Sequence, residues 1–169
     1  MKNISSRAYF ALAVSDMQRA RNFYEAVLEQ EVDSFGGENN VNYKSGICLV
    51  DNYAELVAAE KWATQPTGVN LEIKTKSNST QIIFEVDDLD YWVAKIKSTK
   101  GIEILHDVTE YIWGQRVLRF YDHDKHIIEV WDRLDAVAKR FIAQGRTVEE
   151  VAELLGDSVE NIQRLLRDE

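Results

Sequence analysis

The sequence predicts an α+β fold of two tandem βαβββ modules followed by a helical tail. Residues 9–17 and 81–89 resemble each other at an offset of 72 residues, and each alternates as a strand that ends at an Asp. In both copies a helical pattern follows, and further strands come after it. After residue 133 only helical periodicity remains. We therefore expect a curved mixed sheet around a concave cleft, with added C-terminal helices.

These patterns set the expected boundaries. The main domain covers residues 1–133, with modules at about 7–77 and 78–133, and the tail covers 134–169. The chain has 169 residues, of which 45% are apolar and 10% aromatic, and this composition supports a substantial core.

In the first module, alternation predicts a strand from Tyr9 to Val14, and Asp16 is placed to cap the helix that follows. Phe23, Val27 and Leu28 form the apolar stripe of that helix. Further strands are expected at 31–35, 41–44, 47–50 and, in the linker, 69–74.

In the second module, a strand over 81–86 leads to Asp88 as the helix cap, and Gly101 ends the helix. Strands are expected at 103–105, 115–121 and 127–131, with a polar turn at 122–125.

The sequence of the tail predicts three helices. Gly145 and Gly156 end the first two, Thr147 with Glu150 forms a capping box, and Ser158 caps the third. Ala152, Gly156 and Ile162 have the spacing of a helix-turn-helix, which leaves a ligand-sensing transcription regulator as an alternative function.

Charge argues against nucleic acid as a partner. The chain has 20 Lys and Arg against 29 Asp and Glu, a net charge of −9, and the basic residues do not cluster. From residue 134 onward the chain has five basic residues and eight acidic ones. A DNA-binding protein needs a basic face that contacts the phosphates. We therefore expect the tail to pack on the main domain or on a second subunit.

Other function classes are excluded by composition. No run approaches 18 apolar residues, so no membrane span is expected, and the apolar stretch at 8–14 is too short for a signal peptide. Cys48 is the single cysteine, which excludes an internal disulfide and a Cys-rich zinc site. The expected location is the cytoplasm.

Five segments, taken in order, carry a family resemblance. They are AVSDM (13–17), NFYEAVL (22–28), EVDDLD (85–90), WGQRVLRFYD (113–122) and HIIEVW (126–131). Together the segments resemble the vicinal oxygen chelate superfamily, the fold of glyoxalases, bleomycin resistance proteins and ring-cleaving dioxygenases. The resemblance covers about residues 7–132. It implies a small-molecule ligand and a homodimer.

The resemblance also implies four metal-ligand positions, here Tyr9, Leu49, Gln81 and Glu129. Leu49 has no ligating atom and Tyr9 is a poor ligand, so only Gln81 and Glu129 keep a hard oxygen. Two protein oxygens are too few for a tight site. The expectation is a metal-free binding protein without a cofactor. The alternative is a metal-dependent lyase, isomerase or dioxygenase, with Gln81 and Glu129 as ligands and Glu85 as base.

Strand alternation gives a separate prediction of the cleft. Phe10, Leu12 and Val14 are expected to face the helices, and Cys48 to be inert core on that same side. The ligand-binding candidates are Tyr9, Leu49, Gln81, Trp113, Arg119, Tyr121, Glu129 and Trp131. A mostly apolar cleft with a few polar groups is typical of small-molecule sites.

Several of these candidates have a purely structural role as an alternative to ligand binding. Glu129 and Arg119 fall on one face of adjacent strands, where they form either a buried ion pair or a ligand site. Trp113, with Tyr111 nearby, either closes a pocket or packs on the sheet edge. Trp131 either contacts ligand or fills the mouth of the sheet. His106, His123 and His126 are interpreted as surface residues.

Overall fold

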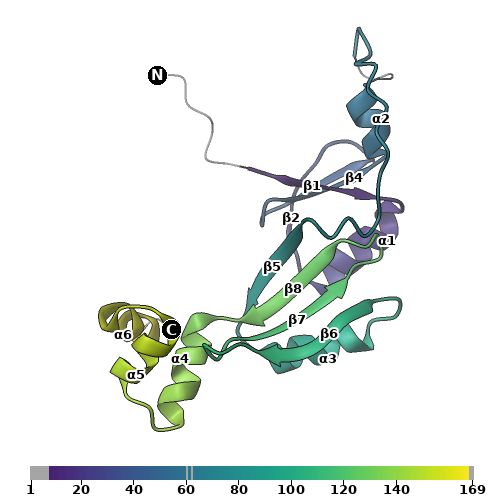
Figure 1. Cartoon of the computed structure of the whole chain (residues 1–169). Helices are drawn as coiled ribbons and strands as arrows, with labels where there is room; N and C mark the ends of the chain where they lie inside the picture. Colours follow the sequence, from purple (N-terminus) through teal and green to yellow (C-terminus); the bar gives the residue numbers. More distant parts are fainter. Residues whose placement is uncertain (1–7, 60, 62, 168–169) are drawn as a thin grey trace, which may run out of the picture. The chain divides into compact units, whose positions relative to one another are not determined.

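A computed structural model describes residues 8–59, 61 and 63–167 (Figure 1). The chain divides into two compact units. The first unit comprises residues 1–79 with 122–126, and the second comprises 80–121 with 127–169. Each unit contains one four-stranded sheet, so the predicted α+β class and the duplication are confirmed. The expected start of the first module, near residue 7, lies outside the described residues.

The first unit has one mixed sheet in the order β1-β4-β3-β2, in which β1 and β4 are parallel and the other pairs antiparallel. Its elements are β1 (Phe10–Val14), α1 (Met17–Arg21), the π-helical turn η1 (Asn22–Val27), β2 (Val32–Phe35), β3 (Asn40–Tyr43), β4 (Ile47–Asp51) and α2 (Tyr53–Ala58). Asp16 caps α1 as predicted, because its side chain accepts a hydrogen bond from the backbone N–H of Arg19 at 2.9 Å.

The register of β1 on β4 corrects two predicted orientations. Leu12 pairs with Leu49 and Ala11 pairs with Cys48, and paired residues share a face of the sheet. Leu12 lies on the helix-facing side, so Leu49 also faces the helices and Cys48 faces the opposite side with Ala11. The prediction was wrong because β4 is apolar at every position from Ile47 to Val50, and such a strand gives no alternation to follow.

One further expectation for the first unit is wrong. Residues 69–74 form no strand, and Val69 and Ile73 are both exposed. Phe10 shares the helix-facing side with Leu12, as expected, but it is 64% exposed because it begins a strand at the sheet edge. The short helix α2 was not predicted.

The second unit repeats the topology in the order β5-β8-β7-β6, again with one parallel pair, β5 and β8. Its elements are β5 (Gln81–Val86), α3 (Leu89–Ser98), β6 (Glu103–Glu110), β7 (Arg116–Tyr121) and β8 (Ile127–Asp132). Leu89 and Ile96 of α3 are fully buried, and α3 packs against β7 and β8. Asp88 caps α3 as expected, accepting from the N–H of Tyr91 at 3.0 Å. Strand β6 continues five residues beyond its predicted end at 105.

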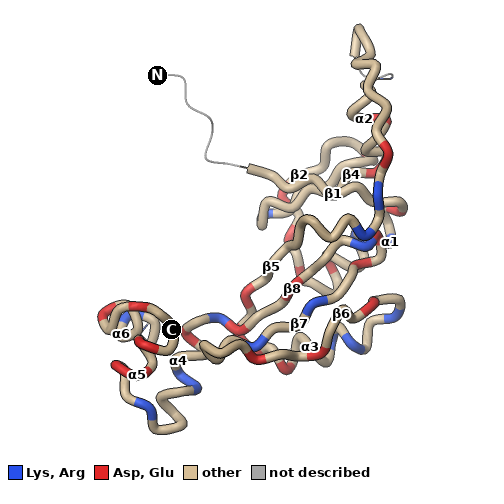
Figure 2. The backbone as a smooth tube through the Cα atoms, viewed as in Figure 1, with Lys and Arg blue, Asp and Glu red and all other residues tan. Residues whose placement is uncertain are grey.

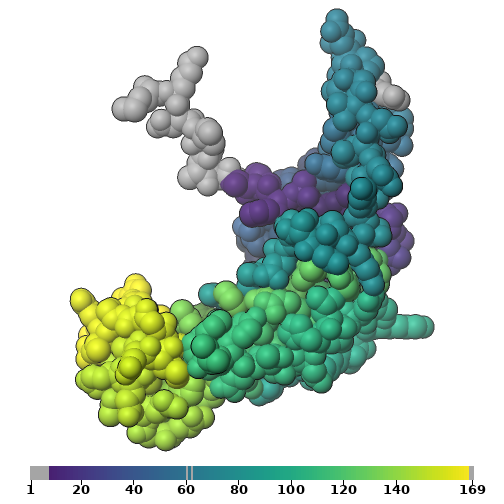
Figure 3. Space-filling model, in the orientation of Figure 1, coloured from purple at the N-terminus to yellow at the C-terminus, as the bar shows by residue number. Residues whose placement is uncertain are grey.

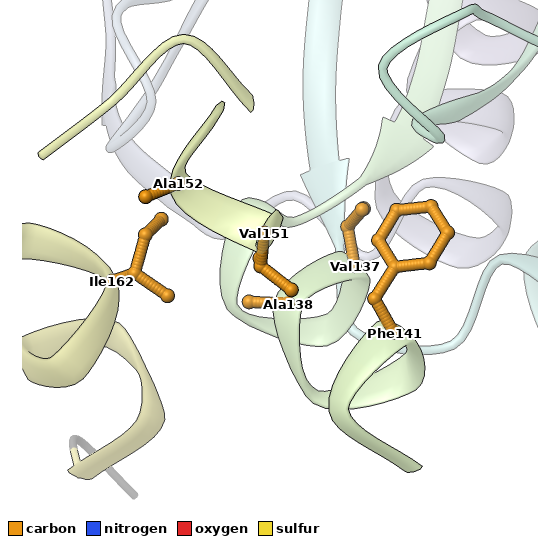
Figure 4. Close-up of a cluster of buried hydrophobic side chains, with 6 residues drawn as sticks. All are labelled: Val137, Ala138, Phe141, Val151, Ala152 and Ile162. Atoms are coloured by element: carbon orange, nitrogen blue, oxygen red, sulfur yellow. The ribbon is translucent and has the colours of Figure 1, made fainter. Parts of the chain in front are cut away.

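The tail forms three helices, as predicted: α4 (Leu134–Ala143), α5 (Val148–Leu155) and α6 (Val159–Arg167). The capping box of Thr147 and Glu150 is present, and Gly156 ends α5 in the left-handed conformation. Ser158 Oγ accepts from the N–H of Asn161 at 3.1 Å. The three helices share one apolar core, drawn in Figure 4, made of Val137, Ala138, Phe141, Val151, Ala152 and Ile162.

The tail is fixed to the sheet of its own unit. Arg140 on α4 donates to the side chain of Asp132 at the end of β8 and to the carbonyl of Gly114 between β6 and β7. The ring of Phe141 lies directly over Gly114. The tail thus packs on the strands that precede it, and Figure 3 shows this contact between the yellow-green and green surfaces. None of the helices in the described part of the chain is long and apolar enough to cross a membrane.

Candidate functional site

The open face of the second sheet, opposite α3, carries three rows of paired residues. The rows are Tyr121–Ile127–Gln81, Arg119–Glu129–Ile83 and Val117–Trp131–Glu85, each running from β7 through β8 to β5. The alternation predicted for this module is therefore confirmed by the register. Five of the candidate residues and Glu85 share this one face.

Arg119 and Glu129 form the centre of this face. They are directly paired across β7 and β8, and the guanidinium Nη2 forms an ion pair with Glu129 Oε2. The Glu129 side chain is 1% exposed, whereas that of Arg119 is 24% exposed. The structure thus places a buried carboxylate beneath a cation that still reaches solvent.

Three other groups surround the same guanidinium. Arg119 Nε donates to Gln81 Oε1 at 3.3 Å, and Nη2 donates to the hydroxyl of Tyr111 at 2.7 Å. Arg119 Nη1 lies 3.2 Å from His106 Nε2. We call Gln81, His106, Tyr111, Arg119 and Glu129 the Arg119 cluster.

His106 has a defined hydrogen-bonding pattern in this cluster. An arginine can only donate, so His106 Nε2 must accept, and the ring proton then lies on Nδ1. That nitrogen is 2.8 Å from the carbonyl oxygen of Asp107, to which it donates. His106 is half-buried, and its pairing with Arg119 was not predicted, because β6 is irregular on both sides of it.

Glu129 is electrostatically strained at this position. Burial raises the pKa of its carboxyl group, and the positive charge of Arg119 only partly offsets the shift. Neither of its carboxylate oxygens accepts a hydrogen bond from any residue the structure describes, although Oε2 forms the ion pair with Arg119. The same holds for the buried indole Nε1 of Trp131, two residues along the same strand. Buried polar atoms of this kind ordinarily have a partner.

Trp113 is linked to the cluster through Tyr111. The two rings lie 4.5 Å apart with an interplanar angle of 34°, and Trp113 Nε1 donates to Gln115 Oε1 at 3.2 Å. Trp113 is 37% exposed, and with Ile112 it lines a pocket of about 520 Å³ whose other residues belong to the tail, between 146 and 154. Tyr121 is buried at 6% exposure.

The two candidates in the first unit do not belong to this cluster. Leu49 is fully buried on the helix-facing side of its own sheet, as described above. Tyr9 precedes β1 and is 43% exposed. Cys48 is buried, and Asn40 Nδ2 donates to its sulfur at 3.2 Å. Burial raises the pKa of the Cys48 thiol, which keeps it in its unreactive form.

A separate pocket lies within the first unit and was not predicted. Its volume is about 450 Å³, and it lies at the ends of β1 and β4 beside the 122–126 turn. His126 lines it, and Asp122 Oδ2 holds the Nδ1 atom of that ring at 2.9 Å. The spacing of Asp122 and His126 around the turn is the signal that could have indicated this pair.

Asp122 is almost fully buried and accepts from several donors. Tyr24 donates from its hydroxyl at 3.0 Å, and the N–H groups of Asp124 and His126 donate at 3.0 and 2.8 Å. Burial alone would raise the pKa of Asp122, but His126 and these other hydrogen bonds hold it below its usual value. Burial lowers the pKa of His126, and the hydrogen bond and charge of Asp122 outweigh this and raise it.

The fold agrees with comparisons to known proteins. A comparison with curated proteins finds no match. Solved structures with the same fold include a lactoylglutathione lyase from Agrobacterium tumefaciens, at 20% identity and a TM-score of 0.56, covering 78% of this chain and 96% of that one. Another is the fosfomycin resistance protein FosX from Listeria monocytogenes, at 18% identity and a TM-score of 0.56, covering 78% and 95%.

A third neighbour is a glyoxalase/bleomycin resistance protein/dioxygenase from Nocardioides, at 18% identity and a TM-score of 0.56, covering 78% of this chain and 85% of that one. These likenesses concern the fold. The sequence itself matches the glyoxalase-like domain over residues 8–135, about three quarters of the chain. The chain therefore belongs to the glyoxalase-like domain family.

Proposed function

We propose that this protein binds a small organic molecule on the open face of the sheet β5-β8-β7-β6, at the Arg119 cluster, without a divalent metal ion. The observation that carries this proposal is the pairing of a buried Glu129 with a partly exposed Arg119. Burying a carboxylate is costly. The buried Glu129 holds the guanidinium of Arg119 in place, and a fixed charge that still reaches solvent is positioned to contact a ligand.

The surroundings of the cluster support a ligand of mixed character. Trp113 and Tyr111 offer apolar ring surface, while Gln81, His106 and Arg119 offer polar atoms. Glu129 Oε1 and Trp131 Nε1 are an acceptor and a donor without a partner among the described residues. Aromatic walls with a few convergent polar groups are typical of small-molecule sites.

The residues of this face do not fit a divalent metal. Gln81 and Glu129, the two retained ligand positions, both contact the guanidinium of Arg119. A cation bound to these oxygens would lie next to a fixed positive charge that cannot be deprotonated in a protein. Leu49, a third expected position, faces the other side of its sheet. The alternative of a metal-dependent lyase, isomerase or dioxygenase is therefore disfavoured.

Metal analysis of protein purified without chelator tests this part of the proposal. We expect well under one Ni, Zn, Fe or Mn per chain. A stoichiometric metal that is lost in a Glu129→Gln variant would contradict the proposal and restore the enzyme alternative.

Ligand binding is tested by screening small organic molecules through thermal stabilisation and tryptophan fluorescence. We expect Trp131→Phe to weaken binding of any stabilising compound. The matched control is Trp92→Phe, because Trp92 lies on α3, on the other side of the sheet. Equal loss in both variants, or loss in neither, would contradict a site on this face.

We further propose a homodimer in the cytoplasm, as the family resemblance implies. Light scattering coupled to gel filtration measures the mass in solution. A 19.5 kDa particle at micromolar concentration would contradict the dimer.

A further inference from the structure

We propose that the guanidinium of Arg119 is the fixed cation of this site, standing where a divalent ion would otherwise sit, and that with the Tyr111 hydroxyl it binds the carboxylate of a small organic acid. This inference rests on the proposed function and adds the chemical class of the ligand.

The hydrogen-bond inventory of Arg119 is the first argument. A guanidinium has five N–H groups. Of these, Nε–H goes to Gln81, one Nη1–H to His106 and one Nη2–H to Tyr111, while Nη2 also forms the ion pair with Glu129 Oε2. Every contact is to an acceptor atom, so the group is held in one orientation. One Nη1–H remains for an acceptor outside the cluster.

The Tyr111 hydroxyl supplies a second donor. Its oxygen accepts from Arg119, so its own proton remains for another acceptor. Accepting a bond from a cation also polarises the hydroxyl and makes it a stronger donor. One N–H and one O–H, both attached to the same charge, suit the oxygens of a carboxylate.

The types of atom around the guanidinium are the second argument. An amide oxygen, an imidazole nitrogen, a phenol oxygen and a carboxylate converge on it from Gln81, His106, Tyr111 and Glu129. Imidazole and carboxylate are ordinary ligands of divalent transition metals, and here both lie against the guanidinium of Arg119 instead. The side chain of Arg119 therefore satisfies a set of acceptors that would otherwise suit a metal.

Removing the guanidinium tests the cation role directly. We expect Arg119→Ala to gain Co²⁺ binding, about 100-fold or more tighter than wild type, because a like charge a few ångströms away is lost. Calorimetry and the visible absorption of Co²⁺ measure it. The matched control is Arg119→Lys, which keeps the charge and should bind no more Co²⁺ than wild type. A folded Arg119→Ala protein with wild-type Co²⁺ affinity would overturn the cation role.

A second measurement uses wild-type protein, so it does not depend on the folding of that variant. Benzoate and benzamide have the same shape and differ in charge. We expect benzoate to bind about 10-fold tighter or more, as charge-assisted hydrogen bonds imply, and Tyr111→Phe to reduce that preference. Equal binding of the two, or binding of neither at millimolar concentration, would overturn the carboxylate inference.

The outcomes separate this inference from the proposed function. Equal binding of benzoate and benzamide that is lost in Trp131→Phe would leave a small-molecule site on this face but refute its preference for an anion. A metal bound stoichiometrically by wild-type protein through Glu129 would refute both.

Discussion

Arg140 Nη1 donates to Asp132 Oδ2 at 3.0 Å, and this bond joins the first helix of the tail to the last strand of the sheet. Asp132 is 2% exposed, and it also accepts from Arg116 Nε at 2.8 Å and Nη2 at 3.0 Å. One buried carboxylate thus serves two arginines. The helical tail is held by a charge network as well as by apolar contacts.

Asp132→Asn should therefore destabilise the second unit. Removing one partner of a fully buried ion pair costs about 3–5 kcal/mol, and we expect a smaller loss here because the side chains of Arg116 and Arg140 are 26% and 27% exposed. Chemical unfolding at neutral pH measures the loss. Asp90→Asn is the matched control, because Asp90 pairs with the same Arg116 on the surface and should cost about 1 kcal/mol or less. Equal effects of the two substitutions would contradict the assignment.

The pH dependence of this effect has a defined sign. Burial alone would raise the pKa of Asp132, but Arg116 and Arg140 hold it below 3.8. The contribution of Asp132 to stability is therefore present above about pH 3.8 and is lost as the pH falls through its folded-state value. The difference between wild type and Asp132→Asn should shrink below pH 3.8, and a difference independent of acidification would argue against this origin.

Gly114→Ala should loosen the contact between the tail and the sheet. Gly114 has a φ of +85°, and a Cβ there would overlap the ring of Phe141. Left-handed backbone costs a non-glycine residue roughly 1–2 kcal/mol, and overpacking adds about 1–3 kcal/mol. Gly145→Ala separates the two effects, because Gly145 has a φ of +89° with nothing within 4 Å of its Cβ. Equal losses of unfolding free energy would mean that the Phe141 contact does not matter.

Glu129→Gln tests the buried carboxylate. The pKa of Glu129 is raised from 4.5, mainly by burial, so the stability it contributes is present below about pH 4.5 and is lost as the pH rises through the folded-state value. The glutamine side chain does not ionise, so the variant does not lose this stability as the pH rises. Relative to wild type, its unfolding free energy should therefore improve from pH 4 to pH 7.

At neutral pH we expect Glu129→Gln to cost less than the ~3–5 kcal/mol of a fully buried pair, since Arg119 reaches solvent and keeps three other partners. Urea unfolding of both proteins across this pH range gives the two curves. Parallel curves would mean that Glu129 has an ordinary pKa and is not buried as described.

The sequence was a good guide to the fold wherever local chemistry decides the structure. The caps at Asp16, Asp88 and Thr147 and the helix end at Gly156 are formed by residues within four positions of each other. The side of the sheet that Leu49 faces was not predictable, because that depends on the register of β4 against β1, which a uniformly apolar strand does not reveal.

The site was predictable in part for the same reason. In β5, β7 and β8 the apolar residues Val86, Phe120 and Val130 mark the buried face, so Gln81, Arg119 and Glu129 could be placed together on the opposite face. His106 could not, because irregular pairing in β6 changes the register on either side of it. The partner of each polar group likewise depends on side-chain geometry rather than on spacing.

The tail should not bind DNA, although its three helices have the order of a helix-turn-helix. Figure 2 shows Asp and Glu interspersed with Lys and Arg along α4–α6. On α6 the Arg164 guanidinium bonds to Asn161 at 2.6 Å, and Glu160 lies in the first turn. A helix that enters the major groove needs free donors for bases and cations for phosphates.

Fluorescence anisotropy with a mixed-sequence duplex tests this expectation. We expect no binding by the whole protein at micromolar concentration in 50 mM salt. As a positive reference, changing Glu149, Glu150, Glu153 and Glu160 to Lys should introduce weak binding, and that binding should fall steeply with added salt because phosphate contacts release counterions. Wild-type binding with the same steep salt dependence would mean that the arginines of the tail contact phosphate, and it would support the regulator alternative.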